Sequence, residues 1–224
     1  MTRYILCAAA ALLLTGCGKD NPPAAAPQPA PAATPAKADT RPVILAFGDS
    51  LTAGHGLPEG QSYADFLQKD LDARGYSYHV VNQGISGDTT DAGVSRLDSA
   101  LALKPQFVIL ELGANDGLRG LPIEKTQENL DAMIAAFQGA GAKVVLCGMT
   151  LPRNYGQNYI KNFEKVFQNL SKTRKTALIP FFLEGVATRP ELMQGDALHP
   201  TAEGCRLVAQ TVFKHLQPLL GRPQ

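Results

Sequence analysis

The sequence predicts an α/β fold in which a parallel sheet is flanked by helices. From about residue 42 onward, short apolar runs alternate with amphipathic stretches, which is typical of strands joined by crossover helices. The first apolar run, residues 43–47, is continuous rather than alternating, as expected for a strand buried on both faces. With 224 residues, the chain has room for one ordinary domain and an additional segment at one end.

Amphipathic stretches separate the apolar runs. Residues 63–74 carry apolar side chains at helical spacing and end at Gly75, and a helix over 91–103 stops before Pro105 because proline disfavours helix in the preceding residue. Further helices are expected at residues 123–138, 159–173 and 201–216. The apolar runs between them predict five strands, at residues 43–47, 78–82, 107–112, 144–149 and 177–179.

The N-terminal segment predicts export. Residues 1–16 have the features of a secretory signal peptide: Arg3 supplies the positive charge, and residues 4–14 form an apolar run too short to cross a bilayer. The sequence Leu-Thr-Gly-Cys ending at Cys17 resembles the bacterial lipobox, in which the cysteine is acylated. We therefore expect an exported periplasmic or cell-envelope lipoprotein anchored in a membrane through Cys17. The alternative is an ordinary cleaved signal with an incidental cysteine.

A Pro/Ala-rich linker over residues 17–41 is expected between this anchor and a folded domain spanning 42–224. Without acylation of Cys17, the same composition would be an untethered tail. The formal net charge of +1 gives no reason to expect nucleic acid as a partner and is compatible with a small neutral substrate. We expect a monomer. Cys147 and Cys205 could form a disulfide or remain as buried free thiols.

Small and polar residues follow the first three expected strands. They lie at residues 48–51, 86–88 and 113–116, and a fourth polar segment, residues 196–200, precedes the last helix. In open parallel sheets the ligand crevice lies beyond the carboxyl ends of the strands. We therefore expect these four segments to converge on one edge of the sheet.

Three residues in these segments predict nucleophilic catalysis. A serine hydroxyl needs a base to remove its proton, and the base needs a third group to orient it. Ser50 is the expected nucleophile, His199 the base and Asp196 the orienting carboxylate. Only two residues separate Asp196 from His199, so the carboxylate can reach Nδ1–H and leave Nε2 to face the serine. Pro200 and Thr201 are expected to start the last helix.

Ester hydrolysis also needs hydrogen-bond donors for the oxyanion that develops on the carbonyl. The candidates are the backbone N–H groups of Ser50 and Gly87 and the side-chain amide of Asn115. Glycine at position 87 would let a substrate approach the backbone closely. Asp49 and Asp116 are interpreted as capping or loop hydrogen-bonding residues rather than as paired catalytic acids.

Together these motifs resemble a known family. The SGNH hydrolase superfamily has four sequence blocks, reproduced here in order as Gly48-Asp49-Ser50-Leu51, Gly87, Gly113-x-Asn115-Asp116 and Asp196-x-x-His199. Residues 85–89, 111–120 and 151–156 resemble its bacterial thioesterase I/protease I/lysophospholipase L1 and arylesterase branch. The resemblance implies a flavodoxin-like three-layer α/β/α sandwich, the same catalytic and oxyanion-hole residues, and no metal or organic cofactor. It also implies a substrate with a medium or long acyl chain.

Other chemistries lack their motifs. Leu51 and Thr52 follow Ser50, so the Gly-x-Ser-x-Gly elbow of α/β-hydrolases is incomplete. Gly54-His55-Gly56 lacks the further residues of a dinucleotide or phosphate loop, and the four histidines show no metal-ligand spacing.

The sequence thus predicts a serine esterase acting through an acyl-enzyme on lysophospholipids, aryl esters or thioesters. A carbohydrate O-acetyl esterase, with a short polar acyl pocket, is the alternative among enzymes, and an inactive lipid- or polysaccharide-binding lipoprotein is the alternative outside them. Five apolar residues flanking the loops favour longer acyl chains: Leu57, Ile85, Leu118, Leu121 and Leu151.

Overall fold

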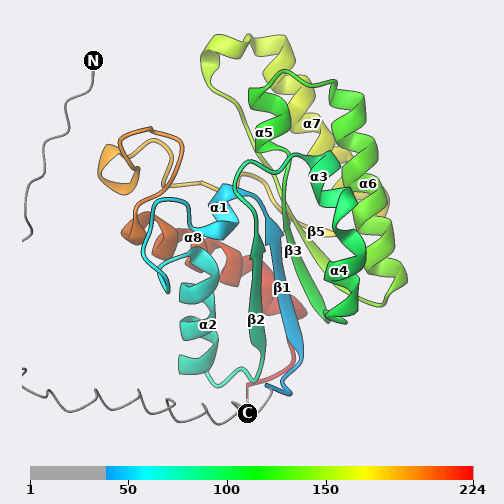
Figure 1. Ribbon diagram of the computed structural model, residues 1–224, viewed down its shortest axis with the longest axis vertical. Coiled ribbons are helices and arrows are strands. Elements are labelled where there is room, and N and C mark those ends of the chain that lie inside the picture. The colour runs from blue at the N-terminus through cyan, green and yellow to red at the C-terminus, as the bar shows by residue number, and fades with distance from the viewer. Residues whose placement is uncertain (1–38, 224) are drawn as a thin grey trace, which may run out of the picture. The chain divides into compact units, whose positions relative to one another are not determined.

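A five-stranded parallel sheet lies at the centre of the computed structural model, which describes residues 39–223. The strand order is β2-β1-β3-β4-β5 (Figure 1). The strands are β1 (Val43–Gly48), β2 (His79–Gly84), β3 (Phe107–Glu111), β4 (Lys143–Cys147) and β5 (Ala177–Ile179). All five predicted strands are confirmed, with ends that differ by at most two residues. The predicted signal peptide, Cys17 and the linker up to residue 38 lie outside the described residues.

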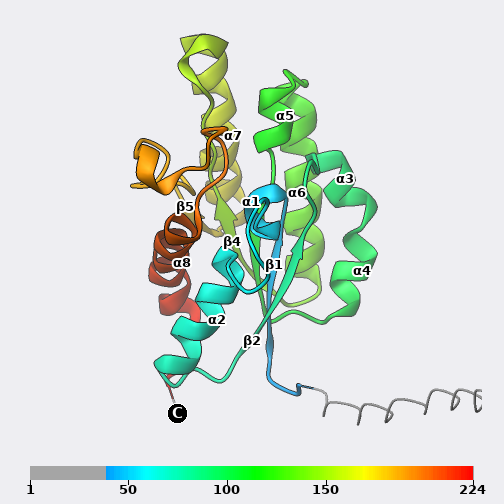
Figure 2. The same ribbon diagram turned by 60° about the vertical axis from the view of Figure 1, so that its left-hand side comes forward.

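Helices cover both faces of the sheet and form the three-layer α/β/α sandwich that the resemblance implies. Helices α2 and α8 pack against each other on one face, while α3, α4, α6 and α7 cover the other (Figures 1 and 2). Their bounds are α2 (Tyr63–Ala73), α3 (Thr90–Ser95), α4 (Leu97–Ala102), α6 (Ile123–Gly139), α7 (Gln157–Arg174) and α8 (Ala202–Leu216). Among residues 39–223, no helix is both long and apolar enough to cross a membrane.

The single helix predicted over residues 91–103 is wrong in one respect. Arg96 leaves the helical region of backbone space (φ −111°, ψ 13°), so the stretch divides into α3 and α4. The Arg96 side chain donates to the Gly48 carbonyl at 2.8 Å and to the Asp88 carboxylate at 2.7 Å. The break therefore coincides with a residue that joins this helical layer to the end of β1.

Several short elements were not predicted. Helices α1 (Ser50–Ala53) and α5 (Ala114–Leu118) follow β1 and β3, in segments that the sequence suggested only as loops. Three 3₁₀ turns were also missed: η1 (Arg153–Tyr155), η2 (Pro190–Leu192) and η3 (Gln217–Leu219). Each is too short to contain a hydrophobic period.

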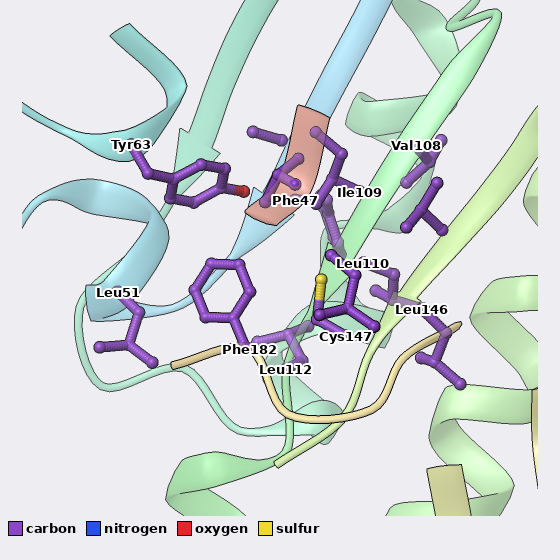
Figure 3. Close-up of a cluster of buried hydrophobic side chains, with 14 of the residues drawn as sticks. Phe47, Leu51, Tyr63, Val108, Ile109, Leu110, Leu112, Leu146, Cys147 and Phe182 are labelled. Carbon is purple, nitrogen blue, oxygen red and sulfur yellow. The ribbon is translucent and has the colours of Figure 1, made fainter. Parts of the chain in front are cut away.

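The core lies on both sides of the central strands. Phe47 packs edge to face against Phe137, with ring centroids 5.6 Å apart, on the α6 side of the sheet. On the α2 side, Tyr63 packs against Phe182 in the same manner, beside the end of β4 (Figure 3). Burying each such side chain stabilises the fold by about 1.5–3 kcal/mol relative to exposure. Cys147 lies within this core.

The two cysteines of the domain do not form a disulfide. Cys147 at the end of β4 and Cys205 in α8 are both free and buried. Burial raises the pKa of the Cys147 thiol well above its ordinary range and that of Cys205 to about 11. The buried-thiol alternative is confirmed for the described structure.

Candidate active site

Ser50 occupies a tight turn between β1 and α1, which we call the Ser50 turn (residues 48–54). Asp49 caps α1 by accepting a hydrogen bond from the Leu51 N–H at 3.0 Å, and Gly54 ends the helix in the left-handed conformation (φ 77°). A Cβ on Gly48 would lie 2.1 Å from the Thr52 hydroxyl, so only glycine fits there. The turn fixes Ser50 at the carboxyl edge of the sheet, just beyond β1, which lies between β2 and β3.

His199 approaches Ser50 from the other end of the chain. Its Nε2 lies 2.9 Å from the Ser50 hydroxyl oxygen, and its Nδ1 lies 2.6 Å from Asp196 Oδ2. Because the carboxylate only accepts, Nδ1 carries the proton and Nε2 can accept a hydrogen bond from the serine. The three predicted residues therefore form one continuous hydrogen-bonded chain.

The segment that carries Asp196 and His199, which we call the His199 loop (residues 193–200), is fixed mainly by its own hydrogen bonds. Asp196 Oδ1 accepts from the backbone N–H groups of Leu198 (2.9 Å) and His199 (3.0 Å). Met193 and Pro200 form a β-bridge at the base of the loop. Thr201 caps α8, which begins at Ala202 and not at Pro200 or Thr201 as predicted. Hydrogen bonds from His199 and from these backbone N–H groups lower the pKa of Asp196 below its ordinary value.

Gln194 ties this loop to the chain that follows the Ser50 turn. Its side-chain amide donates to the carbonyl oxygens of His55 at 2.7 Å and Pro200 at 2.9 Å. Its backbone N–H donates to the His199 carbonyl at 2.7 Å. Gln194 thus contacts both segments that meet at Ser50 and His199, and the sequence offered no motif that could have identified it.

The three expected oxyanion donors line the same cavity as Ser50 and His199. Among residues 39–223, neither the Ser50 N–H nor the Gly87 N–H donates to a protein acceptor, so both remain available for a ligand. Gly87 has φ 87°, and a Cβ there would meet nothing closer than 3.7 Å, at Arg119. Its backbone conformation therefore explains the glycine.

Asn115 is held firmly in the first turn of α5. Both hydrogen bonds of its side-chain nitrogen are to neighbouring loops, one to Asp49 Oδ2 at 3.0 Å and one to the Asp88 carbonyl at 2.9 Å. These bonds fix the amide plane beside Ser50. Asp116 accepts hydrogen bonds from the Thr90 N–H at 2.9 Å and the Thr90 hydroxyl at 2.5 Å, which confirms its interpretation as a loop-bonding residue.

A cavity of about 660 Å³ is lined by Ser50 and His199 and extends away from them. This is within the range of about 300–1,000 Å³ that is usual for small-molecule sites. Of the five apolar residues suggested from the sequence, Leu118 and Leu151 line it, whereas Leu57, Ile85 and Leu121 do not. Further apolar lining comes from residues that the sequence did not identify as part of the site: Met149, Ile160, Phe181, Leu183, Ala187 and Met193.

His55 and Glu111 also lie at this site and were missed. The His55 ring lies against that of His199, with centroids 4.5 Å apart, and its Nδ1 is 3.4 Å from the Ser86 hydroxyl. Glu111, the last residue of β3, is fully buried beneath the Ser50 turn. A lone carboxylate in a continuously apolar strand was the one sequence signal that could have identified it. No group of three or more histidine, cysteine or acidic side chains in residues 39–223 is arranged to hold a metal ion.

Comparison with known proteins gives consistent matches. Residues 46–207 match the GDSL-like Lipase/Acylhydrolase family. The chain is 45% identical to esterase TesA of Pseudomonas aeruginosa over 178 residues, which are 79% of this chain and 89% of that protein. It is 36% identical to thioesterase 1/protease 1/lysophospholipase L1 of Escherichia coli K12 over 186 residues, 83% of this chain and 86% of that one. The crystal structure of a psychrotrophic esterase, EstA from Pseudoalteromonas, inhibited by monoethylphosphonate, superposes with a TM-score of 0.76 at 36% identity, covering 79% and 97% of the two chains.

Proposed function

The chain belongs to the GDSL-like lipase/acylhydrolase family and is a carboxylic ester hydrolase, and we propose that Ser50, His199 and Asp196 are its catalytic triad. The observation that carries the proposal is the hydrogen-bonded chain from Ser50 Oγ through the imidazole to Asp196. Its members come from segments 149 residues apart. Local folding alone does not bring such segments together in this order.

In the proposed reaction, the Ser50 oxygen attacks the acyl carbonyl carbon while its proton passes to His199 Nε2. Asp196 stabilises the imidazolium that results. The oxyanion of the tetrahedral intermediate accepts hydrogen bonds from the Ser50 and Gly87 N–H groups and from the Asn115 amide. Both N–H groups of this amide bond to Asp49 and to the Asp88 carbonyl in the structure, so one of them is shared with the oxyanion during the reaction. The intermediate collapses as His199 protonates the departing alcohol or thiol. Water then attacks the acyl-enzyme while its proton passes to His199, and the second tetrahedral intermediate collapses as His199 returns that proton to Ser50 Oγ, which releases the acid and the free serine.

The cavity supports an apolar acyl chain as the recognised part of the substrate. Apolar side chains dominate its lining, and the exposed Leu198 stands at the triad end. Relatives are named for esterase, arylesterase, thioesterase and lysophospholipase activities, so lysophospholipids, aryl esters and acyl thioesters are the proposed substrate classes. A carbohydrate O-acetyl esterase would need a short polar pocket and is less well supported.

We further propose that the enzyme is exported and anchored through Cys17, following its lipobox-like sequence. An exported enzyme does not meet cytosolic acyl-CoA, so esters at the envelope, lysophospholipids first, are preferred to thioesters. Metabolic labelling with palmitate tests the anchor. Label should be incorporated by the wild type and lost in Cys17→Ser, and persistence of the label in that variant would contradict acylation at this residue.

The catalytic proposal is tested with Ser50→Ala. The variant should keep the wild-type circular dichroism spectrum and lose ester cleavage by several orders of magnitude, because the covalent step is removed. A fluorophosphonate probe should label the wild type and fail to label the variant. A chain-length series of p-nitrophenyl esters should show kcat/KM rising from acetate to longer acyl groups. An unlabelled, inactive wild-type protein would favour the alternative of a lipid-binding lipoprotein.

A further inference from the structure

Glu111 forms part of a buried acidic pair beneath the Ser50 turn. Its side chain is fully buried, and that of Asp49 is 1% exposed. Glu111 Oε2 accepts hydrogen bonds from the Asp49 N–H at 3.2 Å and from the Thr52 hydroxyl at 2.7 Å. Oε1 is buried and has no hydrogen-bond partner among residues 39–223. One carboxyl oxygen of Glu111 therefore holds the turn, and the other faces a site that would not tolerate a charge.

Two carboxylates in such surroundings cannot both be ionised unless a cation compensates them. The titratable groups facing Glu111 are Asp49, the Tyr63 hydroxyl of α2 and the Cys147 thiol of β4, and none of them is basic. Two basic groups lie near Asp49: the His199 imidazole, which bonds Ser50 and Asp196, and the Arg96 guanidinium, which bonds the Gly48 carbonyl and is paired with Asp88. In the described structure, no arginine or lysine forms an ion pair with Glu111 or Asp49. One proton must therefore remain on the pair.

The hydrogen bonds indicate which carboxyl group keeps the charge. Asp49 accepts from the Leu51 N–H and from the Asn115 amide, and both donors favour its ionised form. Glu111 has weaker support on Oε2 and none on Oε1. Burial, and then the nearby Asp49 charge, raise the pKa of Glu111 well above its ordinary value, whereas Asp49 is raised only to about 6.

We propose that Glu111 is an uncharged positioning residue of the esterase reaction. It holds the backbone of the Ser50 turn through its Oε2 acceptor, and by keeping its proton it leaves the single buried negative charge on Asp49, where that charge orients the Asn115 amide. Glu111 acts through Asp49 and Thr52 and does not itself touch the substrate. The inference rests on the proposed function, because it takes Ser50 as the nucleophile.

Glu111→Gln is the most direct test, because glutamine keeps an oxygen acceptor and cannot ionise. In the wild type, folding holds a proton on Glu111 that the unfolded chain releases above about pH 4.3. The stability of the wild type should therefore fall relative to that of the variant as the pH rises. The melting-temperature difference, variant minus wild type, should grow by roughly 3–5 °C per pH unit between pH 5 and 8.

The same substitution at the exposed Glu124 on α6 is the matched control, and its melting-temperature difference should not grow with pH. A constant difference for Glu111→Gln would mean that the folded protein ionises Glu111, and the proposal would be wrong. This measurement does not depend on activity, so it remains informative even if Ser50→Ala contradicts the proposed function.

Activity separates positioning from simple space filling. Glu111→Gln should retain kcat within about threefold, since the acceptor remains. Glu111→Met has a similar volume but no acceptor, and it should lower kcat and the rate of fluorophosphonate labelling at least tenfold, with KM changed less than twofold. If Glu111→Met does not fold, Thr52→Val, which removes one donor to the same oxygen, should lower kcat in the same way. Equal kcat values for Gln and Met, an unchanged kcat in Thr52→Val, or inactivity of a folded Gln variant would each overturn the proposal.

Discussion

The two halves of the triad are supported in different ways. The Ser50 turn lies on the end of β1, and its supporting side chains Asp49 and Thr52 are essentially buried. The His199 loop is open to solvent, with the Asp196 side chain 42% exposed, and it is held by hydrogen bonds within the loop and by Gln194. Buried carboxyl groups of the core thus hold the proposed nucleophile, whereas a solvated carboxylate holds the proposed base.

The electrostatic consequences also differ. Burial raises the pKa of both carboxyl groups under the Ser50 turn, and hydrogen bonding lowers that of Asp196. The two regions therefore respond to pH in opposite directions. The buried pair loses stability as the pH rises, and the His199 loop loses it as the pH falls through the pKa of Asp196 in the folded state. The enzyme should be most robust between these limits.

The largest effect is expected when the base side is broken at Asp196. In Asp196→Asn, the side-chain oxygen can still accept from the loop N–H groups, but the amide presents a donor to His199 Nδ1. The imidazole then carries its proton on Nε2 and cannot accept one from Ser50. We expect kcat to fall about 10⁴-fold, measured by steady-state ester cleavage.

Thermal melts of the same variant add a pH test. The carboxylate contributes stability in full above the unfolded pKa of about 3.9, and this contribution declines as the pH falls from there toward the lower pKa of the folded state. The difference in melting temperature between the wild type and Asp196→Asn should accordingly be present at pH 7 and shrink toward pH 3. Activity within tenfold of the wild type would show that Asp196 does not orient the base.

A smaller effect is expected when the nucleophile side is broken at Asn115. Removal of one oxyanion donor typically lowers kcat about 10²–10³-fold, and Asn115→Ala should behave in this way. Asp49 would lose a donor to its ionised form, so its pKa should rise further. Asn129→Ala is the matched control, because Asn129 is a buried asparagine that bonds Thr90 and does not line the cavity. It should reduce thermal stability with little change in kcat, and equal losses of kcat in the two variants would remove Asn115 from the oxyanion hole.

The smallest effect is expected at Gln194, where the two regions meet. Gln194→Ala removes the side-chain donor to His55 and Pro200, and a net hydrogen-bond contribution of about 0.5–1.5 kcal/mol corresponds to a two- to twelvefold decrease in kcat. Exposed Gln210 on α8 provides the control substitution. A decrease in kcat beyond a hundredfold would mean that the His199 loop depends on the Gln194 hydrogen bonds far more than on its internal ones.

The residues predicted to lie at the site do meet there, for a physical reason. Ser50 and Asn115 lie in the short helices α1 and α5 that follow β1 and β3, Gly87 lies in the loop after β2, and parallel strands place their carboxyl ends at one edge. His199 does not follow a strand, and it was assigned to the site because only two residues separate it from Asp196. Their roles remain predictions until the variants are measured.

The missing features depend on contacts between distant elements. Helix α1 is only four residues long, and the interruption at Arg96 coincides with a bond to Gly48, 48 residues away. Glu111 was predicted correctly as part of a strand. Its burial at the end of that strand depends on α1, whose Thr52 bonds the Glu111 carboxyl group. Hydrophobic periodicity contains no information about this contact between β3 and α1. The same is true of the hydrogen bonds that Gln194 donates to His55 and Pro200.

The two buried thiols can report how different parts of the domain open. Cys147 ends β4 in the central sheet, and Cys205 lies in the first turn of α8, immediately after the His199 loop. Neither can react with a thiol reagent until its surroundings open. Their separate labelling rates under native conditions would therefore measure two opening reactions, that of the sheet around Cys147 and that of α8, which follows His199. Faster labelling of Cys205 would identify the C-terminal helix as the first cooperative unit to open.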